Sequence, residues 1–128
     1  MRLLLDTHIA LWAITDSPKL GTVARDLILA PRNSVFVSAA SVWEIAIKHS
    51  LGRGDMPVSG SRAVELFVSS GYALLPIGAE HAAGVELLPP LHADPFDRLL
   101  IAQARAEPLR LLTRDETVAS YGNDILRV

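Results

Sequence analysis

Short runs of strand-forming residues alternate with helical segments along the whole chain. Strands are expected at residues 2–5, 35–37, 73–75, 110–112 and 124–127. Helices are expected at residues 8–14, 20–29, 62–69, 79–87, 95–106 and 115–119, with one more that ends at Leu51 and is capped by Ser38 or Ser41. Gly52 and Gly71 are the expected helix stops. Because strands separated by helices pair in parallel, this pattern predicts an α/β fold with helices on both faces of a mainly parallel sheet.

The length and composition predict one globular domain over residues 1–128. Half of the residues are hydrophobic and 20% are charged, which argues against disorder. No apolar run reaches the ~20 residues that cross a membrane, and MRLLLD is too short for a signal peptide. The chain has no cysteine, so it forms neither a disulfide nor a thiolate metal site. We therefore expect a cytoplasmic protein without a membrane partner.

The charge balance limits how the chain can meet a partner. The net charge is -2, whereas a general nucleic-acid coat is basic, so any nucleic acid must bind through a local patch. The mean hydropathy of +0.31 predicts that some apolar surface contacts a partner.

Four acidic residues occupy matching places in the predicted fold. Asp6 and Asp115 each follow a strand, and Glu44 lies near the start of the helix after the second strand. Asp97 lies in the first turn of its helix and joins them if that helix points the same way. Strand ends and the following helix starts share one edge of a parallel sheet, where ligands bind. We therefore expect the four carboxylates to lie close together.

Helix capping offers a second explanation for each acid taken singly. SVWE at residues 41–44 and TRDE at residues 113–116 match capping boxes, and DPFD at residues 94–97 places an N-cap before proline. Caps, however, do not require acids to converge, and clustered carboxylates repel each other. A site that keeps such a cluster usually holds a hard divalent cation such as Mg²⁺ or Mn²⁺.

The histidines and glycines indicate no competing site. His8, His49, His81 and His92 show neither HxH nor HExxH spacing, which argues against zinc. His8 follows Asp6 closely and either faces the site or, as we favour, packs locally. No phosphate-binding glycine loop is present.

Four segments together resemble the PIN-domain nucleases, and among them the VapC-like toxins of bacterial toxin–antitoxin pairs. The segments are LLLDTHIALW, SAASVWEIAIK, HADPFDRLLIAQA and LLTRDETVASYG, which span residues 3 to 122 in order. The resemblance implies a metal-dependent ribonuclease whose four acids are Asp6, Glu44, Asp97 and Asp115. We expect Asp6 and Asp97 to be the principal Mg²⁺ ligands, with Mn²⁺ as the alternative ion. Glu44 and Asp115 would complete the acidic shell, and Asp94 would be a cap with a supporting role.

The same resemblance implies further properties of the protein. It implies a three-layer α/β/α sandwich, a homodimer and an RNA substrate. It also implies a cognate antitoxin that binds across the active-site groove and carries the only contact with DNA.

Several cationic and aromatic side chains are candidates for RNA contact. Lys48, Arg53, Arg98 and Arg114 are the cationic candidates, each with solvated surface charge as the alternative, or for Arg98 a salt bridge with Asp94. Trp12 and Trp43 could stack on bases, but their apolar helices favour packing.

Two other functions remain open from the residues alone. A phosphatase could use Asp6 as a nucleophile, although His8 stands where such enzymes place a second aspartate. A non-catalytic binding module is compatible with the apolar excess, but it has no need for four converging carboxylates.

Overall fold

A five-stranded parallel sheet forms the centre of the computed structural model, which describes residues 1–128. The strands are β1 (Arg2–Leu5), β2 (Ser34–Ser38), β3 (Ala73–Leu75), β4 (Arg110–Thr113) and β5 (Leu126–Arg127). Their order is β3-β2-β1-β4-β5, and every neighbouring pair is parallel. The predicted mainly parallel sheet is confirmed, although the last strand is shorter than residues 124–127.

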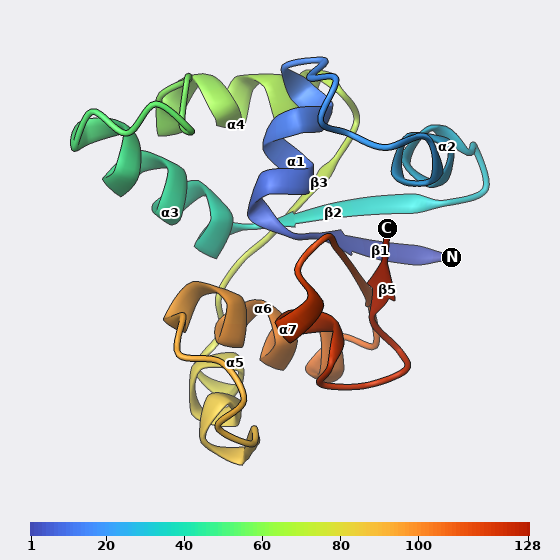
Figure 1. Cartoon of the computed structure of the whole chain (residues 1–128), viewed down its shortest axis with the longest axis vertical. Coiled ribbons are helices and arrows are strands. Elements are labelled where there is room, and N and C mark those ends of the chain that lie inside the picture. Colours follow the sequence, from blue (N-terminus) through green and yellow to red (C-terminus); the bar gives the residue numbers. More distant parts are fainter.

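Helices cover both faces of the sheet. They are α1 (Thr7–Ile14), α2 (Thr22–Leu29), α3 (Ala39–Ser50), α4 (Gly60–Ser69), α5 (Ala79–Gly84), α6 (Pro95–Ala106) and α7 (Glu116–Ala119), with a 3-10 turn at Val85–Leu87. Figure 1 shows α1, α2 and α4 on one side of the sheet and α5, α6 and α7 on the other. This arrangement confirms the three-layer α/β/α sandwich. None of the helices has the length and apolar character that crossing a bilayer requires.

Alternation along the strands divides the core into two apolar clusters. Leu5 and Leu112 belong to the cluster that includes Phe67 of α4, whereas Leu4 and Leu111 belong to the cluster under α6. All four leucines are at most 1% exposed. Successive side chains of a strand point to opposite faces, so both faces of these central strands are buried. This explains why they read as continuous apolar runs.

The chain changes direction across the sheet at β1. β2 and β3 follow on one side of β1, and β4 and β5 lie on its other side. The backbone N–H of Asp6 donates to the carbonyl of Leu112 at 2.9 Å, which joins the ends of β1 and β4. Ligands of parallel sheets bind beyond the strand ends at such a switch point. The fold therefore places Asp6 at the position best suited to a site.

Two helix starts differ from the capping boxes that the sequence suggested. Ser38, not Ser41, caps α3 by accepting a hydrogen bond from the backbone N–H of Ala40. The Ser41 hydroxyl accepts instead from Thr7 at 2.9 Å, so residues 41–44 are not a capping box. Asp115 caps α7, so residues 113–116 are not one either. Glu44 is thus not needed as a cap.

The predicted start of α6 and two predicted helix stops are confirmed. The Asp94 carboxylate accepts hydrogen bonds from the backbone N–H groups of Phe96 and Asp97, and Pro95 is the first helical residue. Gly52 and Gly71 follow α3 and α4 with φ of 75° and 83°, a conformation that glycine adopts without strain. The α6 start brings Asp97 toward the sheet edge.

Candidate active site

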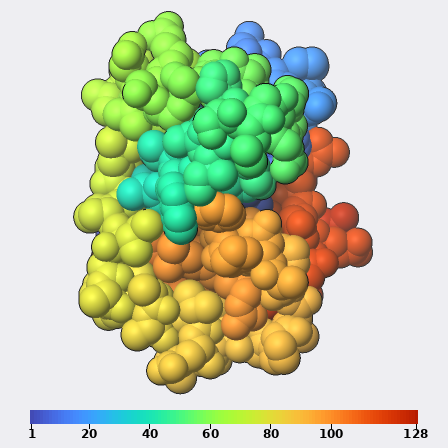
Figure 2. Space-filling model, turned by 90° about the vertical axis from the view of Figure 1, so that its left-hand side faces the viewer, coloured from blue at the N-terminus to red at the C-terminus, as the bar shows by residue number.

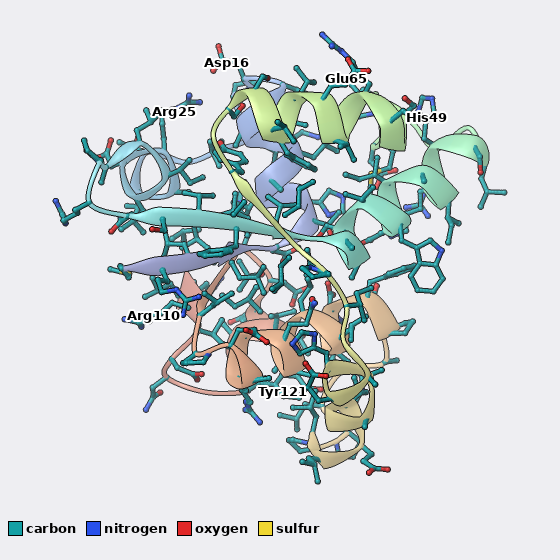
Figure 3. The ribbon with its side chains drawn as sticks, turned by 180° about the vertical axis from the view of Figure 1, so that it is seen from behind. Asp16, Arg25, His49, Glu65, Arg110 and Tyr121 are labelled. Carbon is teal, nitrogen blue, oxygen red and sulfur yellow. The ribbon has the colours of Figure 1, made fainter.

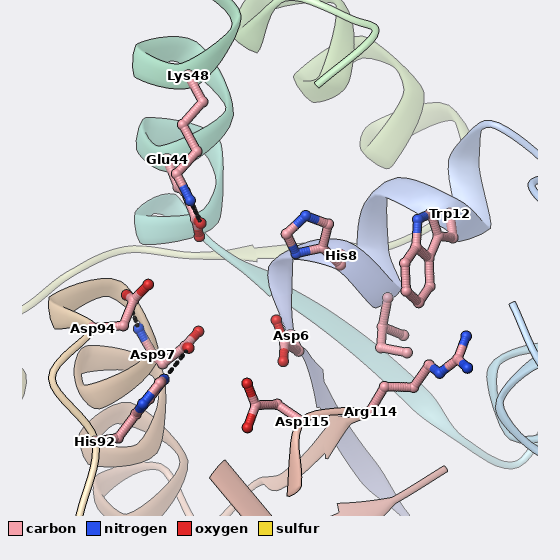
Figure 4. Close-up of a pocket in the computed structure, with 11 residues that line it drawn as sticks. Asp6, His8, Trp12, Glu44, Lys48, His92, Asp94, Asp97, Arg114 and Asp115 are labelled. Carbon is pink, nitrogen blue, oxygen red and sulfur yellow. Dashed lines mark hydrogen bonds and ion pairs between the residues drawn. The ribbon is translucent and has the colours of Figure 1, made fainter. Parts of the chain in front are cut away.

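The four acids converge in one pocket at the carboxyl edge of the sheet. Asp6, Glu44, Asp97 and Asp115 all line a cavity of about 460 Å³. They come from the end of β1, from α3, from α6 and from the start of α7, and Figure 4 shows them around a common space. The convergence expected from strand ends is therefore present in the structure.

Asp6 is held at the floor of the pocket by Thr113. The Thr113 hydroxyl donates to Asp6 Oδ2 at 2.5 Å and accepts from the backbone N–H of Asp115 at 3.0 Å. Asp6 is 8% exposed, and its burial raises the pKa of this carboxyl above the usual range. One buried hydroxyl thus fixes Asp6 relative to Asp115. Sequence reasoning missed Thr113, because a threonine at a strand end carries no signal of its own.

Glu44 lines the pocket and has one unpartnered oxygen. Its side chain is buried on α3. Its Oε2 forms an ion pair at 2.5 Å with Nζ of Lys48, which lies one turn further along the helix. Oε1 is buried and has no hydrogen-bond partner. Leaving a buried acceptor unpaired costs about 1–3 kcal/mol. A cation at this pocket would satisfy that oxygen.

Asp97 lies in a strongly perturbed environment. Burial is the largest cause that raises the pKa of Asp97, to about 7, and the negative charge of Asp6 adds to it. The hydrogen bond between His92 Nε2 and Asp97 Oδ2, 2.7 Å long, lowers the pKa of Asp97 and offsets part of this rise. Carboxylates crowded in this way favour a shared proton or a bound cation. The all-oxygen donor set of the four acids fits a hard divalent ion.

The raised pKa of Asp97 predicts a pH-dependent stability in metal-free protein. Between pH ~4 and ~7 the folded state keeps a proton that the unfolded state releases, so the free energy of unfolding falls as pH rises through this window. Urea denaturation with a chelator at pH 5 and pH 8 measures the difference. An Asp97→Asn variant should show a smaller difference. A variant with the wild-type difference would contradict this assignment.

Histidine enters the site at a position that sequence spacing did not indicate. The ligand atoms of His92, Asp97 and Asp115 all lie within 4.8 Å of one another. His8 also lines the pocket, but its Nε2 contacts Asp55 Oδ2 at 3.3 Å. The spacing of the histidines in the sequence could not indicate this position, because only the folded chain brings His92 beside Asp115.

Each of the four cationic candidates for RNA contact has a partner within the chain. Lys48 and Arg114 line the pocket, where Lys48 pairs with Glu44 and Arg114 donates to the carbonyl of Lys19 at 2.8 Å. Arg53 pairs with Asp55 at 3.2 Å.

Arg98 does not form the salt bridge with Asp94 that was the alternative to RNA contact. It donates to four backbone carbonyls, those of Val85, Leu88, Pro89 and His92, and to the Tyr121 hydroxyl. The fold uses Arg98 to hold the segment before α6. Lys48 and Arg114 remain the cations beside the acids.

The two tryptophans lie in different surroundings. Trp12 is partly buried at the pocket, and the Arg114 guanidinium lies over its ring at 5.4 Å from the centroid. Trp43 is 54% exposed and meets the Phe96 ring edge-on at 5.0 Å. Packing thus accounts for part of each ring, and Trp12 alone also faces the acids.

Comparisons with known proteins agree with this architecture. A family model described as the PIN domain matches residues 3–123. No curated protein matches the chain in sequence.

Solved structures share the fold across nearly the full length. VapBC2 from Rickettsia felis, bound to a DNA fragment from their promoter, is 19% identical with a TM-score of 0.72, covering 100% of this chain and 98% of that one. VapC20 from Mycobacterium tuberculosis, a Sarcin-Ricin loop cleaving toxin, is 14% identical with a TM-score of 0.68 and 98% coverage of both chains. FitAcB from Neisseria gonorrhoeae is 20% identical with a TM-score of 0.65, covering 98% and 96%.

Proposed function

Because the family model covers residues 3–123, the chain belongs to the PIN domain family, and on this premise we propose that it is a divalent-metal-dependent endoribonuclease, the toxin of a toxin–antitoxin pair. The solved structures of similar fold include VapBC assemblies and a toxin that cleaves the Sarcin-Ricin loop. Their identities are below 25%, so they support the fold, and the acidic pocket supports the chemistry.

The observation that carries the proposal is the convergence of four carboxylates in one pocket, where one of them, Glu44, also has an unpartnered oxygen. Asp6, Glu44, Asp97 and Asp115 line the same pocket, and Glu44 Oε1 has no partner. Burial, with a smaller contribution from neighbouring carboxylates, raises the pKa of both Asp6 and Asp97. A fold that needed these acids only as caps would not gather them in one pocket.

Each acid has a separate role in the proposed site. Asp6 and Asp97 are the principal ligands of Mg²⁺, or of Mn²⁺, and Glu44 and Asp115 complete the shell and orient the attacking water. When bound, the cation lowers the pKa of water and offsets charge on the scissile phosphate. Thr113 keeps Asp6 in place through its 2.5 Å hydrogen bond. Lys48 and Arg114, at the pocket, are suited to position a phosphate of the RNA.

Sequencing of RNA ends tests the proposed activity. Brief expression of the wild-type chain should create new RNA ends at defined positions, and an Asp6→Ala variant should not create them. The matched control is Asp26→Ala, because Asp26 is exposed on α2 and does not line the pocket. Identical RNA ends from the wild-type chain and Asp6→Ala would refute the assignment.

The proposal also includes partners and assembly. We propose that residues 1–128 act as one cytoplasmic domain, inhibited by a cognate antitoxin that binds across the acidic groove and alone contacts DNA. The pocket offers carboxylates beside the Trp12 ring, which suit a basic side chain followed by apolar residues. Co-expression with the product of the adjacent gene, followed by co-purification, tests this partner. Recovery of the chain alone would count against it.

A homodimer is supported by an apolar groove away from the acids. The groove has a volume of about 560 Å³ and is lined by α3, α4 and the end of β3, with Trp43 and Leu74 both exposed. Figure 2 shows this face, where α3 in teal lies between α4 in green and α6 in orange. Apolar surface of this kind is commonly covered by a partner. Sedimentation of the purified chain measures the assembly.

A further inference from the structure

We propose that His92 is a nitrogen ligand of the cation in the candidate active site and that it makes this site prefer Mn²⁺ to Mg²⁺. The inference rests on the proposed function and extends it, because the four acids alone supply only oxygen ligands. It concerns His92, the histidine of this pocket whose imidazole contacts one of the four acids.

The geometry places His92 among the side chains that could hold the ion. Its Nε2 lies 2.7 Å from Asp97 Oδ2, and the ligand atoms of His92, Asp97 and Asp115 lie within 4.8 Å of one another. Figure 4 shows the imidazole pointing at Asp97 from the segment that precedes α6. The unpartnered and buried Oε1 of Glu44 belongs to the same pocket. A single ion there can be shared by nitrogen and oxygen.

The position of His92 is held by a network of hydrogen bonds. Arg98 donates to the carbonyls of Val85, Leu88 and Pro89 at 3.0 to 3.4 Å, and these residues precede His92 on the same segment. Arg98 also donates to the Tyr121 hydroxyl at 3.1 Å, and Tyr121 lies on the α6 side of the sheet (Figure 3). Arg98 also reaches the carbonyl of His92 itself at 3.5 Å, so these bonds tie the segment to α6 and hold His92 beside Asp97.

A comparison with His81 shows why His92 is able to bind a metal. The buried His81 also stands between carboxylates, Glu80 and Glu107. Its Nδ1, however, accepts the backbone N–H of Gly78 at 2.9 Å, so the ring proton resides on Nε2, which donates to Glu107 at 2.8 Å. His81 thus has no free lone pair. No hydrogen bond engages Nδ1 of His92, so that nitrogen can carry the proton and leave the Nε2 lone pair for a cation.

The ligand chemistry determines the preferred ion. Mg²⁺ binds oxygen ligands and keeps several waters, so an imidazole adds little to its affinity. First-row transition ions accept imidazole nitrogen, and among them Mn²⁺ also suits carboxylates and water. One imidazole among several carboxylates therefore favours Mn²⁺.

Pulsed electron paramagnetic resonance of the Mn²⁺-loaded chain tests this contact directly. The wild-type chain should show coupling between Mn²⁺ and a ¹⁴N nucleus. A His92→Gln variant, which keeps a hydrogen-bond donor to Asp97, should lose the coupling. His8→Gln is the matched control, because His8 lines the same pocket but contacts Asp55, and it should keep the coupling. Coupling that survives in His92→Gln overturns the inference.

Metal titrations separate this inference from the proposed function. In His92→Gln the affinity for Mn²⁺ should fall by at least about tenfold, whereas the affinity for Mg²⁺ should change much less. Equal losses for both ions would mean that His92 only orients Asp97, which overturns the inference and leaves the proposed ribonuclease intact. A wild-type chain that binds neither ion overturns both.

Discussion

An Asp97→Asn variant is expected to remain folded but to cleave RNA at least about 100-fold more slowly in the presence of metal. Asparagine has nearly the same shape and can still accept a hydrogen bond from His92, but it lacks the charge that holds a divalent cation. The start of α6 should survive, because Asp94 and not Asp97 caps this helix. Loss of activity in this variant would therefore reflect the missing carboxylate.

The same substitution should raise the stability of the metal-free protein at pH 8 or leave it unchanged. The wild-type carboxylate is buried near the charge of Asp6, which raises the pKa of Asp97 to about 7 and makes the charged form costly. Single-turnover cleavage and urea denaturation of one preparation measure both effects. Asp26→Asn, on the exposed side of α2, should change neither. A strongly destabilised Asp97→Asn would instead assign the carboxylate a structural role.

Ser38→Ala is expected to destabilise the fold by about 2–4 kcal/mol, because one hydroxyl performs two tasks. Ser38 is fully buried; its Oγ accepts from the backbone N–H of Ala40 and donates to Gln103 Oε1 at 2.5 Å. The substitution removes the cap of α3, the helix that carries Glu44. It also leaves the buried oxygen of Gln103 without its donor. Both consequences lower the free energy of unfolding.

Urea denaturation of four variants, Ser38→Ala, Gln103→Leu, their double variant and Ser50→Ala, measures this effect. Ser50→Ala is the matched control at the other end of α3, because its exposed hydroxyl donates only to the carbonyl of Ile47, and it should change stability by less than about 0.5 kcal/mol. The double variant Ser38→Ala/Gln103→Leu should lose less than the sum of the two single variants, because both polar partners are gone. Strict additivity, or a Ser38→Ala variant as stable as Ser50→Ala, would contradict the two tasks assigned to Ser38.

The amino-acid sequence by itself determined those features that depend on neighbouring residues. The apolar run of β1, the proline after Asp94 at the start of α6, and Gly52 and Gly71 as helix stops all act within a few residues. Such local signals predicted the strand–helix alternation. They also placed Asp6 and Asp115 just beyond the ends of their strands, because a parallel sheet puts all such ends on one edge.

Only the tertiary structure decided which of two similar residues takes part in a contact. Ser38 and Ser41 are equal candidates for the α3 cap until Thr7, from another helix, donates to the Ser41 hydroxyl. Thr113 reaches Asp6 across 107 positions of the chain, because β4 pairs with β1. His92 joins Asp115 because Arg98 ties its segment to α6. These contacts join residues that are far apart in the sequence, and a local sequence pattern cannot indicate which distant residues will meet. The residues that support the acids are therefore identified only in the folded sheet.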